Sequence, residues 1–380
     1  MSSEVTLLLT TFLLLVLLAY PFVIYPAVLN LMPRRPFPRP TSSDSPMSAA
    51  LVFCAYNEEK SLPEKLRNLR AIKERAPALE IIAYSDCSTD RTLDLLATAP
   101  DVVRVIAGDE RLGKATGMKR LVASTQAEII ICTDANVNLE ITAIDRLLAY
   151  FRDPSIGTVA GTLHYVNDKE GQTARVGSLF WRLEEWIKGL ESATGSTMGA
   201  DGSIFAIRSR LYPTVPPHLL DDLIASITPL FAGYRVVSAP DVHAFERTTT
   251  DSVDEFRRKR RIACRAYNTH RFLVPQLRHL KALDKFKYFS HKYLRWFSFL
   301  SLLLVSVSAT IALAVFIGFV PAFTVVFSGA AFLVAAHWFK LPLIGTVAEM
   351  LVSIVAVGIG VIDAMSGRTY QTWVPAKSRQ

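Results

Sequence analysis

The feature that most limits how this chain can fold is a long uncharged run at its N-terminus. Residues 5–29 contain no charged side chain, and residues 7–18 are almost entirely apolar. About 20 apolar residues cross a bilayer core as a helix. A cleaved signal peptide fits poorly, because the run is too long for a signal core and is preceded by Glu4 rather than by Lys or Arg. We therefore predict an N-terminal transmembrane helix over residues 1–30.

The C-terminal part of the chain is apolar again. Residues 297–319 carry no charge, 322–338 form a shorter apolar run, and 341–362 carry a single acid. We predict about three membrane segments over residues 297–363, of which the short middle one either crosses or re-enters. Three full crossings would place the tail, residues 364–380, on the side opposite the central domain, whereas its basic residues favour the same side. The sequence leaves this conflict open.

A linker rich in Pro and Arg, residues 31–47, follows the first predicted span. It contains Arg34, Arg35 and Arg39, and no basic residue precedes the span. By the positive-inside rule, the chain beyond the span is cytoplasmic, and the expected location is the inner membrane. The cysteines match neither a metal site nor a compact disulfide framework, and unpaired thiols agree with the cytosol. They are Cys54, Cys87, Cys132 and Cys264.

The net charge of +8 is concentrated in one stretch. Residues 255–295 contain 13 Lys or Arg against two acids, so the rest of the chain is slightly acidic. A local excess argues against nucleic acid as a partner of the whole protein. A basic stretch that leads into a span fits an interfacial segment on anionic lipid, a phosphate site, or both.

Between its apolar ends the chain alternates short β-rich runs with helical stretches. The predicted strands are 49–55, 80–84, 102–107 and 128–133, and the predicted helices are 61–75, 88–96 and 113–124. This alternation predicts an α/β domain with a mainly parallel sheet, within residues 41–290. Ligands bind beyond the carboxyl ends of such strands. The polar clusters of the sequence fall at those ends.

There are four polar clusters: Ala55-Tyr56-Asn57-Glu58-Glu59, Ser85-Asp86-Cys87-Ser88-Thr89-Asp90, Arg111-Leu112-Gly113-Lys114 and Thr133-Asp134-Ala135-Asn136. Ser88 could cap a helix and Asp90 could be a first-turn carboxylate, but Asp86 precedes the cap and has no predicted structural role. Asp134 and Asn136 place two oxygen-bearing side chains two residues apart after a buried strand. That spacing suits a divalent cation that bridges a diphosphate, although a turn explains a lone D-x-N as well.

In this order and spacing, the clusters resemble the nucleotide-binding half of a family 2 glycosyltransferase with the GT-A fold. That family commonly has D-D-G-S-T-D as its second cluster; here Ser85 replaces the first Asp and Cys87 replaces the Gly. The resemblance implies that Asp134 is the first acid of the family's D-x-D, with Asn136 in place of the second, as ligands of Mg²⁺ or Mn²⁺. It implies these donor-binding residues: Ala55, Tyr56, Glu58, Asp86, Lys114 and Asp134.

The resemblance continues through the acceptor half. Residues 196–208 match the family's small-residue stretch before a strand. Small residues there let a sugar approach the backbone closely. The resemblance implies acceptor contacts at Gly199, Asp201 and Gly202.

The pair Asp221-Asp222 stands where family members carry T-E-D. In that register Asp222 is the general base and Asp221 its neighbour. Deprotonation of an acceptor hydroxyl needs a nearby carboxylate, and paired acids can raise one pKa toward neutrality. The alternative is that both acids only begin a helix, since the residues from Leu223 onward look helical.

Residues 255–262 stand where processive members of the family carry Q-x-x-R-W. In this register Arg258 replaces Gln, Arg261 matches Arg, and Ile262 replaces Trp. The resemblance implies that Arg261 neutralises the leaving diphosphate, which a planar guanidinium does well. The missing Trp is the family's stacking platform for an acceptor, so its loss argues against long-chain processive synthesis. The alternative is a solvated basic helix at the membrane surface.

We expect a membrane-bound inverting glycosyltransferase that moves a sugar from a nucleotide-sugar donor, with a UDP-sugar as the expected donor, to a lipid-linked or growing polysaccharide acceptor at the cytoplasmic face. The catalytic domain is expected over residues 48–275, followed by a basic interfacial segment over 276–296. A single base and no candidate carboxylate nucleophile agree with inversion. The sequence leaves the donor sugar, the linkage and the oligomeric state open.

Two other functions fit the sequence less well. A dinucleotide-dependent oxidoreductase needs glycines after the first strand, and residues 54–58 contain none. An inactive membrane scaffold that kept the fold would not need Asp86, Asp134 and Asp222, whose presence favours an enzyme.

Overall fold

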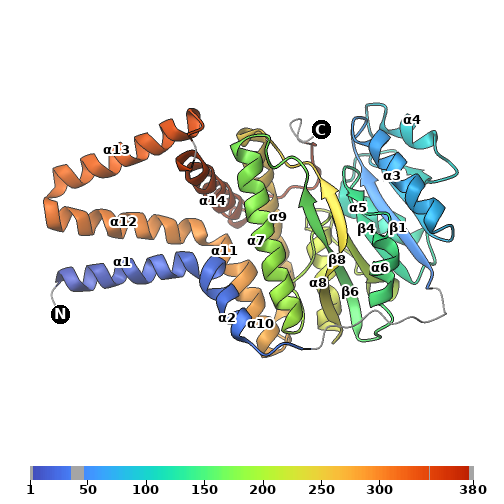
Figure 1. Ribbon diagram of the computed structural model, residues 1–380, viewed down its shortest axis with the longest axis horizontal. Helices are drawn as coiled ribbons and strands as arrows, with labels where there is room; N and C mark the ends of the chain where they lie inside the picture. Colours follow the sequence, from blue (N-terminus) through green and yellow to red (C-terminus); the bar gives the residue numbers. More distant parts are fainter. Residues whose placement is uncertain (1–2, 36–46, 342, 376–380) are drawn as a thin grey trace.

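The computed structural model describes residues 3–35, 47–341 and 343–375. Most of the predicted Pro/Arg-rich linker lies outside these residues, as do the last five residues of the tail. Figure 1 shows an α/β domain built on one sheet and a group of long helices that extends away from it.

One eight-stranded sheet forms the centre of the domain, with the order β3-β2-β1-β4-β7-β6-β8-β5. Strands β1 to β4 pair in parallel, β7 runs antiparallel to both β4 and β6, and β8 pairs in parallel with β6. The predicted α/β fold is confirmed, and the sheet is mixed. The strands are β1 Ala49–Ala55, β2 Glu80–Ser85, β3 Arg104–Ala107, β4 Ile129–Thr133, β5 Asn138–Leu139, β6 Ile156–Tyr165, β7 Ile204–Arg208 and β8 Arg235–Glu246.

Amphipathic helices cover the sheet because their apolar residues recur at the helical period. In α3, for example, Leu62, Leu66, Leu69 and Ile72 are all buried against the core. The helix predicted from residue 88 begins only at Thr92. The helices of the domain are α3 Leu62–Arg75, α4 Thr92–Ala97, α5 Lys114–Ala123, α6 Ala143–Tyr150, α7 Gln172–Ala193, α8 Asp221–Phe231 and α9 Ser252–Leu277.

Four helices are long and apolar enough to cross a membrane. The first is continuous from α1 (Ser3–Ala19) through the π-helical turn η1 (Tyr20–Ile24) to α2 (Tyr25–Leu31). Pro21 and Pro26 lack a backbone N–H, which accounts for the wider turn at this point. The other three are α12 (Ser298–Ile317), α13 (Phe319–Trp338) and α14 (Ile344–Met365).

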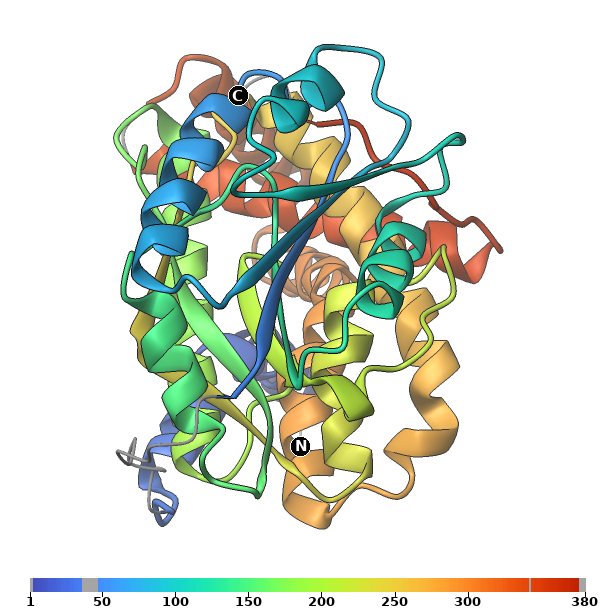
Figure 2. The same cartoon turned by 90° about the vertical axis from the view of Figure 1, so that its right-hand side faces the viewer.

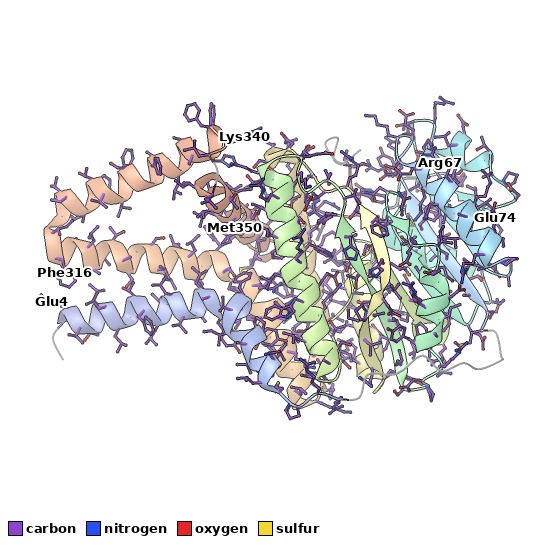
Figure 3. The ribbon with its side chains drawn as sticks, viewed as in Figure 1. Glu4, Arg67, Glu74, Phe316, Lys340 and Met350 are labelled. Atoms are coloured by element: carbon purple, nitrogen blue, oxygen red, sulfur yellow. The ribbon has the colours of Figure 1, made fainter. Side chains whose placement is uncertain are left out.

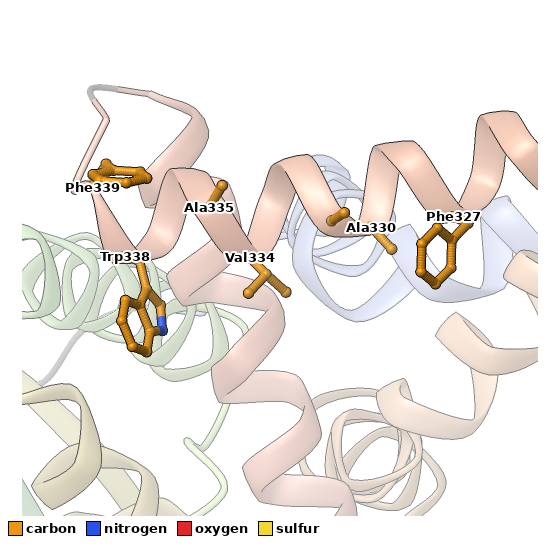
Figure 4. Close-up of a pocket in the computed structure, with 7 residues that line it drawn as sticks. Phe327, Ala330, Val334, Ala335, Trp338 and Phe339 are labelled. Atoms are coloured by element: carbon orange, nitrogen blue, oxygen red, sulfur yellow. The ribbon is translucent and has the colours of Figure 1, made fainter.

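The middle C-terminal segment is a complete helix rather than a short one. Helix α13 has 20 residues, which corresponds to about 30 Å and is enough to cross a bilayer core. Figure 3 shows Glu4 and Phe316 at the end of the helices that lies far from the sheet. An apolar hollow on α13, lined by Phe327, Trp338 and their neighbours, carries almost no polar surface and suits lipid contact rather than substrate recognition (Figure 4).

Helix α14 runs differently from the other three. In Figure 1, α1, α12 and α13 follow the long axis, whereas α14 is foreshortened beside α7 and α9; Figure 2 shows the molecule from the side. The acids of α14 face α9: Ser252 Oγ lies 3.0 Å from Glu349 Oε2, and Arg260 Nε lies 2.6 Å from Asp363 Oδ2. Helix α9 of the sheet domain therefore provides hydrogen-bond partners for the polar side chains of α14.

The chain beyond α14 returns to the sheet domain. The carbonyl oxygen of Arg368 accepts from Asn268 Nδ2 at 3.0 Å, and Gln371 Nε2 donates to the carbonyl oxygen of Leu112 at 3.1 Å. The described part of the tail therefore packs against the sheet domain.

The basic stretch, residues 255–295, contains several internal ion pairs. Between α9 and α12 it forms α10 (Ala282–Tyr288), the π-helical turn η3 (Phe289–Tyr293) and α11 (Leu294–Trp296). Several of its cations pair with acids inside the protein, so much of the excess charge is internal. These pairs are Arg258 with Glu255, Arg260 with Asp363, Arg265 with Asp221, and Lys292 and Arg295 with Glu184.

Candidate active site

The carboxyl ends of the parallel strands bring three of the polar clusters and the acid pair together. Lys114, the first residue of α5, places its Nζ 2.6 Å from Asp134 Oδ1 and 3.8 Å from Asp221 Oδ2. One ammonium group thus joins a predicted donor residue to the predicted catalytic pair. Burial opposes the charge of Lys114, but the two carboxylates raise its pKa above the usual value. Lys114 is therefore a cation at the centre of the site.

The small-residue loop lies directly against this centre. A Cβ atom on Gly202 would lie 2.9 Å from Lys114 Nζ and 3.2 Å from Asp134 Oδ2. A larger residue here would have to displace the ends of the Lys114 and Asp134 side chains, so glycine lets the loop lie against them undisturbed. The predicted acceptor residue Gly202 therefore abuts the predicted donor residues.

Other residues of this loop are held by internal bonds. Asp201 Oδ2 lies 2.9 Å from Lys188 Nζ, and its other oxygen accepts from the backbone N–H of Ser203 at 3.0 Å. Gly199 has φ +101°, a conformation that favours glycine. The charge of Asp201 is thus used inside the protein, and acceptor contact at Asp201 stays a prediction.

Tyr56 and Arg111 form one wall at the predicted nucleoside end. The guanidinium carbon of Arg111 lies 3.6 Å from the centroid of the Tyr56 ring, which is a close cation–π contact. Ala55 is fully buried at the end of β1, and its carbonyl oxygen accepts from the N–H of Asp86 at 2.9 Å. The end of β1 is thereby tied to the second cluster.

The expectation that Asp86 has no structural role is wrong. Its carboxylate is fully buried and accepts from the backbone N–H groups of Leu112 and Gly113, each at 2.9 Å. Buried carboxylates need such donors. Asp86 therefore holds the loop that leads into Lys114, whatever it contributes to the nucleoside.

The first two clusters are also bound to each other. Asp90 Oδ2 accepts from the backbone N–H of Glu59 at 3.1 Å, and Oδ1 accepts from the backbone N–H of Thr92 at 2.9 Å. The second bond agrees with the interpretation of Asp90 as a carboxylate at the start of a helix. Glu58 is buried and accepts from Ser61 Oγ at 3.1 Å. Cys87 has φ +55°, so the chain adopts the left-handed turn here without the family's glycine.

Asp134 and Asn136 fit a divalent cation that takes most of its ligands from a substrate. The Asp134 side chain is about one-third exposed (32 %), and Asn136 donates from Nδ2 to Glu246 Oε1 at 2.9 Å, which leaves its carbonyl oxygen as a possible ligand. Mg²⁺ is commonly bound by one or two protein oxygens together with phosphates and water. In the described part of the chain, no group of three His, Cys, Asp or Glu residues could hold a metal by itself.

The two acids of the pair occupy different environments. They are the first residues of α8, as the helix-start alternative predicts. Asp221 is buried, with Lys114 Nζ 3.8 Å and Arg265 Nη2 3.7 Å away. Asp222 is half-buried, and burial together with the charge of Asp221 raises its pKa to about 6. A pKa near the working pH suits a general base, so the geometry favours Asp222 for that role.

Arg261 lies on the turn of α9 that faces the site. Burial and the charges of Arg265 and Arg258 lower its pKa to about 10, against the attraction of Asp134 and Asp222. Within residues 3–35, 47–341 and 343–375, no ion pair involves Arg261. Its guanidinium therefore keeps the capacity to bind an anion.

The sequence reasoning missed the residues that reach the site from far along the chain. Arg265 pairs with Asp221, and the tail supplies Gln371 and Trp373. The Trp373 ring lies 6.0 Å from the Tyr56 ring between centroids, and its carbonyl oxygen accepts from Arg111. An isolated aromatic residue in a basic tail carries no pattern that predicts this contact.

Residues 50–215 match the family model described as Glycosyl transferase family 2. The chain is similar in structure to the mannosyltransferase PcManGT from Pyrobaculum calidifontis in complex with GDP-Man and Mn²⁺, with 19% identity and a TM-score of 0.71, covering 95% of this chain and 99% of that one. It is also similar to S. aureus TarS 1–349 in complex with UDP-GlcNAc, with 16% identity and a TM-score of 0.44, covering 85% and 93%. No curated protein matches the chain. The match over residues 50–215 and the fold shared with PcManGT confirm the predicted resemblance and the GT-A fold.

Proposed function

Since residues 50–215 form a glycosyl transferase family 2 domain and the protein is thus a glycosyltransferase, we propose that it transfers a sugar with inversion from a nucleotide-sugar donor to an acceptor hydroxyl at the cytoplasmic surface of a membrane. The observation that carries the proposal is the position of Lys114, between Asp134 at the end of β4 and the acid pair at the start of α8. We assign Lys114 to the diphosphate of the donor and the neighbouring acid pair to the base.

The donor site extends from the Tyr56 wall to Lys114. The nucleoside is proposed to lie at Tyr56 and Arg111, and the diphosphate between Lys114 and Arg261. The negative charge of the diphosphate would then be offset by these two cations. Asp134 and Asn136 would hold Mg²⁺ or Mn²⁺, and the PcManGT complex contains Mn²⁺. Such a cation supplies charge neutralisation for a leaving diphosphate.

Transfer follows from these positions. Asp222 accepts the proton of the acceptor hydroxyl, whose oxygen forms a bond to the anomeric carbon of the donor sugar. The bond between that carbon and the diphosphate oxygen breaks, and Lys114 and Arg261 offset the charge on the departing group. Asp221 is buried with Lys114 and Arg265 beside its carboxylate, so we assign it a structural role and assign the base to Asp222. One base and a single displacement invert the anomeric centre.

The acceptor is proposed to be a lipid-linked or growing polysaccharide. Helix α9 supports this, because it carries Arg261 and at the same time packs along the apolar helix α14. An acceptor at the membrane surface would therefore lie next to the reacting centre. Ile262 in place of the family's Trp favours the addition of few sugars rather than a long chain.

Three of the four apolar helices are proposed to cross the membrane. Helices α1 and α12 run side by side and α13 turns back at an angle from the far end of α12, whereas α14 packs its polar face against α9 and is proposed to lie at the surface (Figure 1). With this topology, the domain after α1 and the tail after α14 both face the cytoplasm. Arg34 and Arg35, which follow the first helix, favour that orientation.

A panel of nucleotide sugars tests the proposed function. Full-length protein in lipid is incubated with each donor and with Mg²⁺ or Mn²⁺, and the released nucleoside diphosphate is measured. We expect one donor to give metal-stimulated release that rises when acceptor lipid is added, and we expect Asp222→Asn protein to lower this acceptor-dependent release by about 10²- to 10⁴-fold. Equal release by the variant and the wild type would contradict the assigned mechanism.

A further inference from the structure

A second charged cluster is buried between α7 and the segment that enters α12. His291 lies between two acids of α7, with Nδ1 2.8 Å from Glu191 Oε1 and Nε2 3.0 Å from Glu184 Oε2. Glu191 and His291 are fully buried. Each ring nitrogen of His291 thus lies within hydrogen-bond distance of a carboxylate oxygen.

Two further cations contact Glu184. Lys292 Nζ lies 2.8 Å from Glu184 Oε1, and Arg295 donates to the other oxygen of Glu184. Burial alone would raise the pKa of the Glu191 carboxyl, but His291 holds it at about 2. A buried ion cluster is weak evidence for stability, whereas leaving one member unpaired is strongly unfavourable. Such a cluster therefore specifies one arrangement of the elements that carry it.

One oxygen of Glu191 connects the two places where the chain enters its apolar helices. Oε1 accepts from Tyr25 Oη at 2.6 Å, at the start of α2, as well as from His291 in η3. The π-helical turns at these two entrances also contact each other, with Tyr20 Oη 3.0 Å from Ser290 Oγ. Figure 1 shows α2 and α10 beside α7.

The other oxygen of Glu191 holds the beginning of the acceptor-side loop. Oε2 accepts from Thr197 Oγ1 and from the N–H of Met198, each at 3.0 Å. Lys287 reinforces this contact, because its Nζ donates to the carbonyl oxygens of Glu191 at 2.8 Å and Ser196 at 3.1 Å. Four residues beyond Met198, the same loop places Gly202 against Lys114 and Asp134.

We propose that Glu191 is a positioning residue, which holds the acceptor-side loop, residues 197–203, in the place needed for transfer. The position of the loop would depend on how α2 and η3, the segments next to the apolar helices, pack against Glu191. The inference rests on the proposed function, since it concerns the transfer step. Glu191 does not touch the predicted nucleoside wall. Transfer should therefore depend on Glu191, whereas donor binding should not.

Glu191→Gln tests the inference in full-length protein in lipid nanodiscs. The amide nitrogen would meet donors from Tyr25 and His291 or from Thr197 and Met198, so one set of bonds is lost. A small misplacement at a distance can reduce a rate by about 10- to 100-fold. We expect a loss of kcat of that size, a dissociation constant for the nucleoside diphosphate within about twofold of wild type, and faster amide hydrogen exchange over residues 197–203.

Glu184→Gln is the matched control. Glu184 contacts the same His291, and its substitution by Gln removes the same charge. Among the described residues, Glu184 has no contact with the loop. We expect this variant to lose stability while kcat and loop exchange stay at wild-type values. Thr197→Val removes one loop bond and keeps every charge, so it should act in the same direction as Glu191→Gln with a smaller effect.

Equal losses of kcat in Glu191→Gln and Glu184→Gln would overturn the inference, because Glu191 would then serve only to pack helices. Unchanged loop exchange in Glu191→Gln would overturn it as well. If Glu191→Gln does not fold, Thr197→Val decides, and wild-type exchange and kcat in that variant count against the inference. A wild-type protein that transfers from no donor would refute the proposed function alone, since hydrogen exchange still reports how the loop is seated.

Discussion

Three aspartates of the candidate site differ in role because their surroundings differ. Asp134 is partly exposed and paired with Lys114, Asp221 is buried between two cations, and Asp222 has a raised pKa of about 6. The same side chain can serve as ligand, structural anion or base, depending on burial and neighbouring charge. The predictions at this scale separate the three roles.

Asp222→Asn should reduce transfer by about 10²- to 10⁴-fold, which is typical for the loss of a general base. The substitution keeps the shape of the side chain, so nucleoside diphosphate binding measured by calorimetry should survive. Asp221→Asn should lower stability, because Lys114 and Arg265 lose an anionic neighbour, while transfer falls less. Normal transfer in Asp222→Asn together with an inactive Asp221→Asn would shift the base to Asp221.

The pH profile of kcat/KM should show a base with a pKa of about 6. A raised carboxyl pKa means that Asp222 is protonated, and unable to accept a proton, below this pH. The rate should therefore fall about tenfold per pH unit on the acid side and level off above it. A profile that stays flat down to pH 4.5 would exclude Asp222 as the base.

Asp134→Ala should abolish metal-stimulated binding of the donor nucleotide and nearly all turnover. The reason is that Asp134 supplies the carboxylate of the proposed cation site, with Asn136 as a neutral partner. Calorimetry with a nucleoside diphosphate, with and without Mn²⁺, measures the effect, and a thermal melt confirms the fold. Full metal-stimulated activity in this variant would contradict the cation site.

Elements distant in sequence complete the site. The loop before α5 is held by Asp86 from the second strand and by Gln371 from the tail. A Cβ atom on Gly113 would lie 2.3 Å from the carbonyl oxygen of Gln371, so tail and loop are in tight contact. The nucleoside wall therefore depends on a segment that follows the last apolar helix.

Trp373→Ala should weaken donor binding and leave kcat almost unchanged. The Trp373 ring packs beside Tyr56, and aromatic pairs contribute about 0.5–1.5 kcal/mol, which corresponds to a rise in donor KM of roughly 2- to 10-fold. Trp373→Phe keeps an aromatic ring and is the control. Steady-state kinetics with varied donor give the measurement. An unchanged KM in the alanine variant would show that the tail is irrelevant to the donor.

At the scale of the whole molecule, the sheet domain and the apolar helices are joined by α9 and α14. Arg260 of α9 pairs with Asp363 of α14 at 2.6 Å, and Lys259 Nζ donates to Ser353 Oγ at 2.6 Å. The reacting centre is thereby held close to the proposed membrane surface, where a lipid-linked acceptor would be presented.

Cysteine labelling should place the domain and the tail on one side of the membrane and the turn between α12 and α13 on the other. Cys87 in the domain and Thr372→Cys in the tail should react in inside-out vesicles, whereas Gly318→Cys should react in intact spheroplasts. Each position is tested in a background that lacks the other cysteines. Labelling of Thr372→Cys from outside would contradict the surface position of α14.

The amino-acid sequence alone determined the fold class, strands β1 to β4 and the approximate position of the apolar helices. These features depend on neighbours along the chain: β1 was predicted at residues 49–55, where the structure has it, and an uncharged run of sufficient length defines the first helix. The spacing of the four polar clusters also sufficed for the resemblance to family 2 glycosyltransferases, which the comparison over residues 50–215 confirms.

Only the tertiary structure decided which charges meet. Asp86 accepts hydrogen bonds from the backbone before α5, and Trp373 lies beside Tyr56. Among the cations of α9, some form internal ion pairs, whereas Arg261 forms none with the described residues. The angle of α14 and the Glu191 cluster depend in the same way on contacts between residues about 90 to 165 positions apart. Electrostatic and hydrogen-bond energies are set by distance and burial in space, and local sequence patterns carry neither.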